Sequence, residues 1–329
     1  MKLSNIPICE ARVAQRTSSS KGPQTMILID IHCRPGANAA TAARDVRDLA
    51  RKLQHGDPKT FGLLDCKGVV KQIDTSKPSE RVYFTMVLRV PPDLNTPQSL
   101  RDRLINDKED NGIFDKFSIA RELAKSVNYV HVFGFVHKNV RPETILTFRD
   151  SEANASSTFL IGFNNFRKED GQTYLRGDED WEKNLYRHPS RQGNTPEAEY
   201  SMQHDIYSLG VCLLEIGLWA SFVEYDDQGR HPQCSTALEL PSESAELGSP
   251  AALKDHLLAF ARTRLPHQMG RKFTKVVETC LTCLDRDNAD FGNESEFLDE
   301  DGILVGVRYI EKVVSVHGEC CVIEWSNAL

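Results

Sequence analysis

The sequence predicts an α+β protein, with a β-rich region followed by a larger helical region. Segments rich in β-branched residues are concentrated in residues 26–92, which end at the strand-breaking pair Pro91-Pro92. Apolar residues at helical spacing dominate residues 93–329. Residues 1–25 are polar and contain the turn-forming run 18–23, so we expect an irregular N-terminal segment there.

The β-rich region has four predicted elements. Residues 26–32 form a strand by their β-branched content. Residues 42–53 form a helix, because four apolar residues recur at helical spacing between charged ones: Val46, Leu49, Ala50 and Leu53. Residues 61–72 and 81–90 are two further strands.

The region after the two prolines is mostly helical. Helices are predicted over 99–105, 117–131, 203–220, 252–262, 271–284 and 305–314, with a short apolar strand over 158–163 and a polar loop over 225–250. No segment repeats another, so we expect residues 26–329 to fold as a single domain.

Composition limits the kind of protein this is. The 329 residues carry a formal net charge of -7 without a dense basic run, which argues against a nucleic-acid partner. The longest apolar stretch, 210–222, is too short to cross a bilayer and contains Glu215. The start has no apolar run typical of a signal peptide. Nine irregularly spaced cysteines favour free thiols, and we expect a cytoplasmic protein.

The pair Cys280 and Cys283 has the spacing of half a zinc site. A zinc site needs a second pair of ligands, and the sequence offers only the adjacent Cys320-Cys321. Both thiols also fall on the apolar face of the helix predicted over 271–284. We therefore expect buried structural thiols and no metal site.

The most informative segment is 136–146, Val-His-Lys-Asn-Val-Arg-Pro-Glu-Thr-Ile-Leu. It is similar to the protein-kinase catalytic loop, His-Arg-Asp-Leu-Lys-Pro-Glu-Asn-Ile-Leu. His137 stands at the histidine, Asn139 at the catalytic aspartate, Arg141 at the lysine and Thr144 at the metal-binding asparagine.

Three more landmarks follow in the kinase order. Residues 159–164 resemble the strand that ends in Asp-Phe-Gly, with Gly162 in place of the aspartate. Pro189 stands in the position of Ala-Pro-Glu, and Asp205 begins a helix similar to Asp-x-Trp-Ser-Leu-Gly. Over about residues 25–315 the chain thus resembles the eukaryotic protein kinases, which implies a two-lobed kinase-like fold.

The resemblance is closer to a fungal group of degenerate kinase-like proteins. It rests on residues 134–139, 185–193, 280–285 and 301–311. Members of that group often carry an N-terminal prion-inhibition domain linked to heterokaryon incompatibility, and we carry over none of that domain's activity.

The resemblance implies that the chemistry is lost. Phosphoryl transfer needs magnesium ligands, a lysine on the phosphates and a carboxylate that accepts the hydroxyl proton. Asn139 has no basic lone pair, Gly162 has no side-chain oxygen, and Thr144 has a short hydroxyl. His32 falls at the phosphate lysine, with Asp45 or Asp48 as its candidate carboxylate partner, and no Gly-rich loop precedes it.

The remaining residues are expected to be structural. By the resemblance, His137 holds the loop and Asp205 accepts backbone hydrogen bonds from it. Arg141 contacts either phosphate or an internal acid, which leaves His32 and Arg141 as the candidate nucleotide contacts. Ser190 lacks the carboxylate that kinases pair with a later arginine.

Two hypotheses of different class follow. In the first, the chain is a pseudokinase that binds another protein as a signalling scaffold and needs no cofactor. In the second, it is an atypical kinase that uses ATP and magnesium and recruits other acids, such as Glu143, Glu169 or Asp170. The acidic stretch 294–301 is expected to be a solvated loop or, secondarily, a partner surface.

Overall fold

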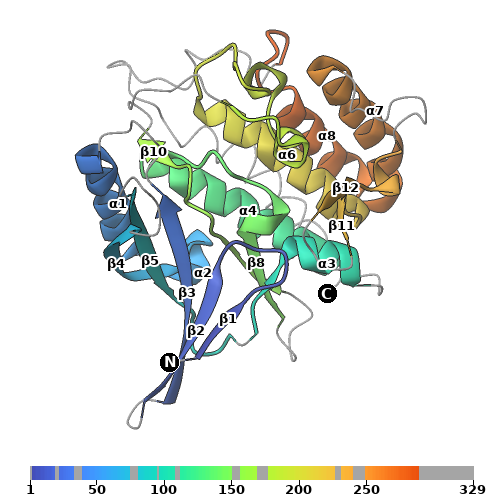
Figure 1. Ribbon diagram of the computed structural model, residues 1–329. Helices are drawn as coiled ribbons and strands as arrows, with labels where there is room; N and C mark the ends of the chain where they lie inside the picture. Colours follow the sequence, from blue (N-terminus) through green and yellow to red (C-terminus); the bar gives the residue numbers. More distant parts are fainter. Residues whose placement is uncertain are drawn as a thin grey trace.

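The computed structural model describes residues 2–18, 22–32, 39–74, 81–94, 96–107, 112–149, 156–168, 177–226, 231–239 and 249–288. These residues form a small β-rich lobe and a larger helical lobe, which is the predicted α+β arrangement (Figure 1).

The small lobe is built on an antiparallel five-stranded sheet in the order β1-β2-β3-β5-β4. Its strands are β1 (Lys2–Asn5), β2 (Arg12–Ser18), β3 (Gly22–His32), β4 (Asp65–Asp74) and β5 (Arg81–Arg89). Side chains alternate along β3: Ile27 and Ile29 enter the main core, whereas Met26 and Leu28 form a separate small cluster with Ala14 on the opposite face.

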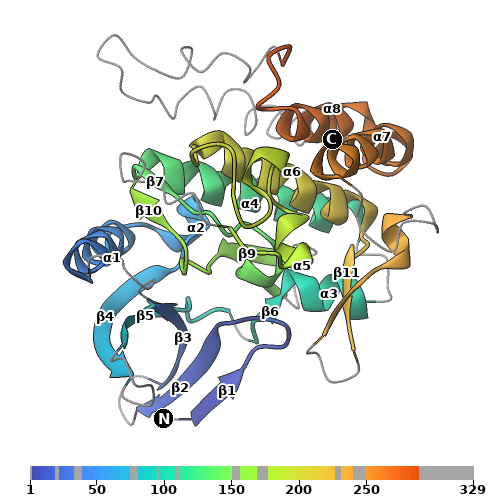
Figure 2. The same cartoon turned by 45° about the horizontal axis from the view of Figure 1, so that its top comes forward.

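Helix α1 (Ala39–Leu53) covers one face of this sheet and lies beside β4 (Figure 2). Val46 and Leu49 are buried there, so the predicted apolar stripe is the face that packs. The short helix α2 (Pro58–Phe61) follows, and its N-cap is Asp57. Because α2 occupies this part of the chain, β4 begins later than the strand predicted over 61–72.

The irregular segment predicted over residues 1–25 was wrong for the residues described, which form β1, β2 and the start of β3. Strand β2 contains Arg12, Gln15 and Arg16 and shows no clear apolar alternation. Its backbone pairs with β1 on one side and β3 on the other, so neighbouring strands, and not local propensity, make it a strand.

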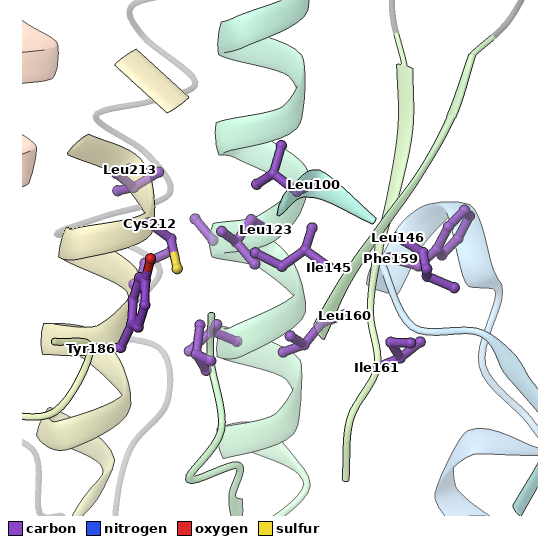
Figure 3. Packing of buried hydrophobic residues seen from close by; sticks show 14 of the residues in the cluster. Leu100, Leu123, Ile145, Leu146, Phe159, Leu160, Ile161, Tyr186, Cys212 and Leu213 are labelled. Atoms are coloured by element: carbon purple, nitrogen blue, oxygen red, sulfur yellow. The ribbon is translucent and has the colours of Figure 1, made fainter. Parts of the chain in front are cut away.

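The large lobe is organised around two long helices, α4 (Ile113–Val132) and α6 (Met202–Leu218). These pack together in one core and correspond to the helices predicted over 117–131 and 203–220. Figure 3 shows Leu123 of α4 between Cys212 of α6 on one side and Ile145 on the other. The helical lobe is thus a rigid support for the loop that precedes Ile145.

Shorter elements complete this lobe. The helices are α3 (Leu100–Asn106), α5 (Trp181–Asn184), α7 (Pro250–Gln268) and α8 (Gly270–Leu281), with 3₁₀ turns at Pro142–Thr144, Pro189–Arg191 and Thr236–Leu238. The strands are β6 (Gln98–Ser99), β7 (Phe135–Val136), β8 (Ile145–Arg149), β9 (Ser156–Leu160), β10 (Arg167–Lys168), β11 (Val223–Tyr225) and β12 (Pro232–Cys234).

Several predicted segments lie partly or wholly outside the described residues. The loop predicted over 225–250 contains β12 and a 3₁₀ turn, although much of its polar remainder lies outside the described residues. The helix predicted over 305–314 and the acidic stretch 294–301 also lie outside them. Within the described ranges, no helix has the length and apolarity needed to span a membrane.

Candidate functional site

Asp205, at the start of α6, holds the kinase-like loop, residues 136–146, through hydrogen bonds. Its fully buried carboxylate accepts hydrogen bonds from the backbone N–H groups of His137 (2.7 Å) and Lys138 (2.8 Å), from the Tyr200 hydroxyl (2.7 Å) and from His131 Nε2 (3.1 Å). Burial alone raises the pKa of Asp205, but the hydrogen bonds from His131 and Tyr200 outweigh it, and the pKa falls to about 2. These bonds hold Lys138 in a left-handed conformation with φ 64°.

His137 connects the loop to the segment that directly follows β9. Its Nε2 donates to the Ile161 carbonyl at 2.9 Å, and its ring meets the Phe163 ring edge to face at 4.9 Å. Burial lowers the pKa of His137 to about 4, so the ring is neutral at physiological pH. A neutral, buried ring in these contacts positions the loop and does not carry charge.

Both polar atoms of the Asn139 side-chain amide make hydrogen bonds to neighbouring residues. Nδ2 donates to the Gly162 carbonyl at 3.2 Å, and Oδ1 accepts from Arg141 Nε at 3.0 Å. Asn139 is the residue that the kinase pattern aligns with the catalytic base. Its side chain acts here as an internal bridge between two segments.

Thr144 and Gly162 pack against each other where the kinase pattern places two magnesium ligands. The Thr144 hydroxyl is buried, 2.8 Å from the Asn139 carbonyl and 2.9 Å from that of Arg141. Gly162 has φ +85°, and a Cβ atom there would lie 2.4 Å from Thr144 Cγ2. The space that a carboxylate at residue 162 would need is therefore filled by the threonine methyl group.

Arg141 makes internal ion pairs. Its guanidinium lies 3.4 Å from a Glu10 oxygen and 4.0 Å from Glu143. Burial alone lowers the pKa of Arg141, but these two carboxylates outweigh it and the pKa lies above its usual value. The second Glu10 oxygen accepts from Asn164 Nδ2 at 2.6 Å, so one carboxylate bridges both segments of the site.

Glu10 lies on the loop between β1 and β2, and this loop is fastened to the large lobe. Ile6 and Ala11 at its ends are buried, and the Pro7 carbonyl accepts a hydrogen bond from Ser99 Oγ at 2.8 Å. Sequence reasoning missed Glu10 altogether. Its partners Arg141 and Asn164 lie 131 and 154 residues further along the chain, and no local signal marks a contact of that range.

His32, the residue aligned with the phosphate lysine, lies exposed at the end of β3, where its ring stacks on Tyr83 at 5.3 Å. Asp48, one candidate partner of His32, pairs instead with Lys168 at 2.6 Å. Two residues before His32, Asp30 pairs with Arg12 at 2.6 Å and accepts from Thr85 at 2.6 Å. An internal carboxylate–guanidinium pair thus lies on this part of β3.

Arg101, Glu143 and Glu215 form a buried ionic cluster, in which Glu143 belongs to the loop. Arg101 is fully buried and contacts Glu143 (3.1 Å), Glu215 (2.6 Å), Ser221 (2.6 Å) and the Tyr186 hydroxyl. Burial alone raises the pKa of Glu143, but Arg101 and Arg141 outweigh it and the pKa falls to about 2. Such a weakly basic carboxylate, held in ion pairs, is poorly suited to accept a proton.

The structure also shows the surroundings of Pro189, Cys280 and Cys283. Pro189 begins a 3₁₀ turn, and the neighbouring Ser190 hydroxyl lies 2.9 Å from His188 Nδ1. Cys280 and Cys283 are buried, and Cys283 Sγ lies 3.1 Å from the Gln203 carbonyl. Across the described ranges, no group of three or more His, Cys, Asp or Glu side chains is arranged to hold a metal ion. Glu169 and Asp170 lie outside those ranges.

Comparison with known proteins supports the fold. No protein-family model matches the sequence, and no curated protein matches it. Among solved structures, the chain is similar to one in the CAK complex from Chaetomium thermophilum bound to ATP-gamma-S, with a TM-score of 0.55 and 15% sequence identity. The match covers 95% of this chain and 88% of that one. The chain therefore has a two-lobed protein-kinase-like α+β fold.

Proposed function

We propose that this chain is a pseudokinase: a protein-binding or signalling scaffold that has lost phosphoryl transfer and is akin to the fungal degenerate kinase group. One observation carries the proposal. The residues aligned with the catalytic base and the magnesium ligands, Asn139, Thr144 and Gly162, satisfy and pack against one another. Their groups are engaged internally and offer no carboxylate to a proton or a metal ion.

The phosphate side of the cleft supports the same function. Glu10 places a carboxylate on Arg141, in the kinase-like loop, and on Asn164, in the segment after β9. A nucleotide triphosphate would have to displace that carboxylate and bear its repulsion. We therefore expect weak or absent ATP binding, little improvement by magnesium, and partner binding that requires no nucleotide.

The alternative is an atypical active kinase with relocated acids. Glu143 is a poor candidate for such an acid, because its carboxylate is buried in ion pairs with Arg101 and lies close to Arg141. The alternative then depends on Glu169 or Asp170, on residues that the structure does not describe.

Phosphoryl transfer from labelled ATP by the purified full chain tests the proposal. We expect incorporation indistinguishable from that of a variant lacking residues 137–144. A thermal-shift titration with ATP, with and without magnesium, measures nucleotide binding in parallel. Magnesium-dependent autophosphorylation that Arg141→Ala or Thr144→Ala reduces would establish the alternative.

The setting of this function is also proposed. The acidic net charge of -7 and the thiol-rich composition are consistent with a cytoplasmic protein that binds another protein and not nucleic acid. Fractionation of cells that express the tagged chain, followed by nuclease treatment of its complexes, would check both points.

A further inference from the structure

A pocket of about 440 Å³ lies where α1, β7 and β10 meet, and its lining residues Phe133, Gly134 and Phe135 directly precede the kinase-like loop. It is lined by Asp48, Arg51, Lys52, Phe133, Gly134, Phe135 and Lys168. In Figures 1 and 2, α1 lies next to β10 at the side of the molecule. The volume is within the range of pockets that bind small ligands or peptide side chains.

The charges around this pocket are mostly positive. The lining contains three cations, Arg51, Lys52 and Lys168, and one carboxylate, that of Asp48. The Asp48 carboxylate lies 2.6 Å from Lys168 and 3.7 Å from Arg51. The Arg51 side chain is 75% exposed, and Arg47, one turn earlier on α1, is exposed as well. In a chain of net charge -7, such a local excess of cations attracts an anionic partner to this place.

The ammonium group of Lys52 can donate further hydrogen bonds to a carboxylate. Its Nζ donates to the Phe133 carbonyl at 2.7 Å and lies 5.6 Å and 5.9 Å from the ring centroids of Phe133 and Phe135. An ammonium group has three donors, and no other hydrogen bond of Lys52 occurs within the described ranges. Lys52 is exposed, so an added carboxylate can reach its ammonium group.

The pocket also has an apolar part. Phe133 is half-buried and contacts Phe61 and Tyr129 beneath it, which fixes its ring. The adjacent Val132 is 49% exposed. Gly134 has φ +75°, and a Cβ there would meet open space, so the backbone leaves this side of the pocket uncovered. A rigid aromatic surface beside cations suits a side chain that is apolar and flanked by acids.

We propose that this pocket binds an acidic peptide segment of a partner protein, with an aromatic or leucine side chain on Phe133 and carboxylates on Lys52 and Arg51. The proposal rests on the scaffold function above and names the kind of partner. The mixture of ring surface and cations favours a peptide over nucleic acid, because the basic area is small and its neighbours are apolar.

Calorimetric titration of the full chain with an unlabelled decapeptide of Asp and Glu with one central Phe, at physiological salt, tests this. We expect one-to-one binding that Arg51→Glu weakens by at least about tenfold, with a similar loss for Lys52→Gln. Arg44→Glu is the matched control: the residue is exposed on the same helix and does not line the pocket. It should weaken binding by about twofold at most, since salt screens charges beyond the Debye length.

The proposal is overturned if the wild-type chain does not bind the peptide, or if Arg51→Glu and Arg44→Glu weaken binding equally while both variants melt like wild type. Equal binding of a peptide with Ser in place of Phe would also overturn it. If neutralising residues Glu294, Glu296 and Asp299 of the chain raises peptide affinity about tenfold, the chain's own acidic stretch occupies the pocket, which overturns an external partner. Phosphoryl transfer is measured separately, so failure here leaves the pseudokinase proposal standing.

Discussion

Gly162 and Thr144 fit each other closely, so a larger side chain at residue 162 has no room. A Cβ atom at Gly162 would lie 2.4 Å from Thr144 Cγ2, and the threonine methyl group occupies the space that a carboxylate there would need. Protein interiors are close-packed, so a side chain introduced at this position would force its neighbours to move. At the residue scale, the site is therefore tightly packed.

Gly162→Ala should lower the free energy of unfolding by about 1–3 kcal/mol more than Gly270→Ala does. Both glycines have positive φ, +85° and +80°, but a Cβ at Gly270 would meet open space, so it reports the backbone strain alone. Urea denaturation measures the free energy of unfolding of both variants. Adding Thr144→Ser, which removes the obstructing methyl group, should recover part of the loss, and equal losses at the two glycines would contradict the packing argument.

At the scale of elements, buried charges fasten separate segments to one another. Arg101 of α3 contacts Glu143, in the 3₁₀ turn of the kinase-like loop, and Glu215 of α6. Glu10 connects the β1–β2 loop to Arg141 and Asn164. The first link joins three elements of the large lobe, and the second joins the small lobe to the large lobe.

Arg101→Met should destabilise the chain by about 3–5 kcal/mol, because two carboxylates would be left buried without their cation. Arg262→Met is the matched control, since Arg262 pairs with Glu278 at 3.0 Å but its side chain is 58% exposed. That pair should contribute less than about 1 kcal/mol. Chemical denaturation of both variants checks the difference, and similar losses would show that burial does not matter here.

Glu10→Ala should raise the affinity of the full chain for ATP without magnesium by about tenfold, because the competing carboxylate leaves Arg141 and Asn164. Glu197→Ala, at an exposed glutamate, controls for the change in net charge. Calorimetry or thermal shift provides the measurement. If nucleotide binding is the same in both variants, Glu10 does not guard the phosphate side.

At the scale of the whole molecule, several histidines are buried in the neutral form. Burial lowers the pKa of His137 and of His188 to about 4, and that of His204 to about 3. In the unfolded chain these side chains take up protons near pH 6.5. Proton uptake by the unfolded chain alone favours unfolding as pH falls.

Stability should therefore be fully present above about pH 6.5 and fall as pH drops from there toward 4. For His137, which is fully buried, the shift from 6.5 to about 4 corresponds to about 3 kcal/mol at the end of that range. Urea denaturation at several pH values measures the slope, and His137→Asn should reduce it. A stability independent of pH over this range would show that these rings do not stay neutral in the fold.

Much of the fold could be predicted from local patterns. α1 and α4 each have an apolar stripe and α6 is apolar over most of its length, and the structure confirms all three helices. Strand β2 could not be predicted, because its pairing with β1 and β3 depends on neighbours and not on its own residues. The buried position of Cys280 followed from helical spacing, which is a local property, whereas Cys283 is buried beyond the end of α8, in a turn that the predicted helix over 271–284 did not anticipate.

By itself, the sequence determined that residue 139 is no carboxylate base, since the chemistry of Asn139 is set by its identity alone. Only the tertiary structure decided what fills the site instead. Thr144 takes the space beside Gly162, and Glu10 reaches Arg141 from the other lobe. Such contacts join residues up to 131 positions apart, so they depend on how the lobes pack and leave no periodic trace in the chain.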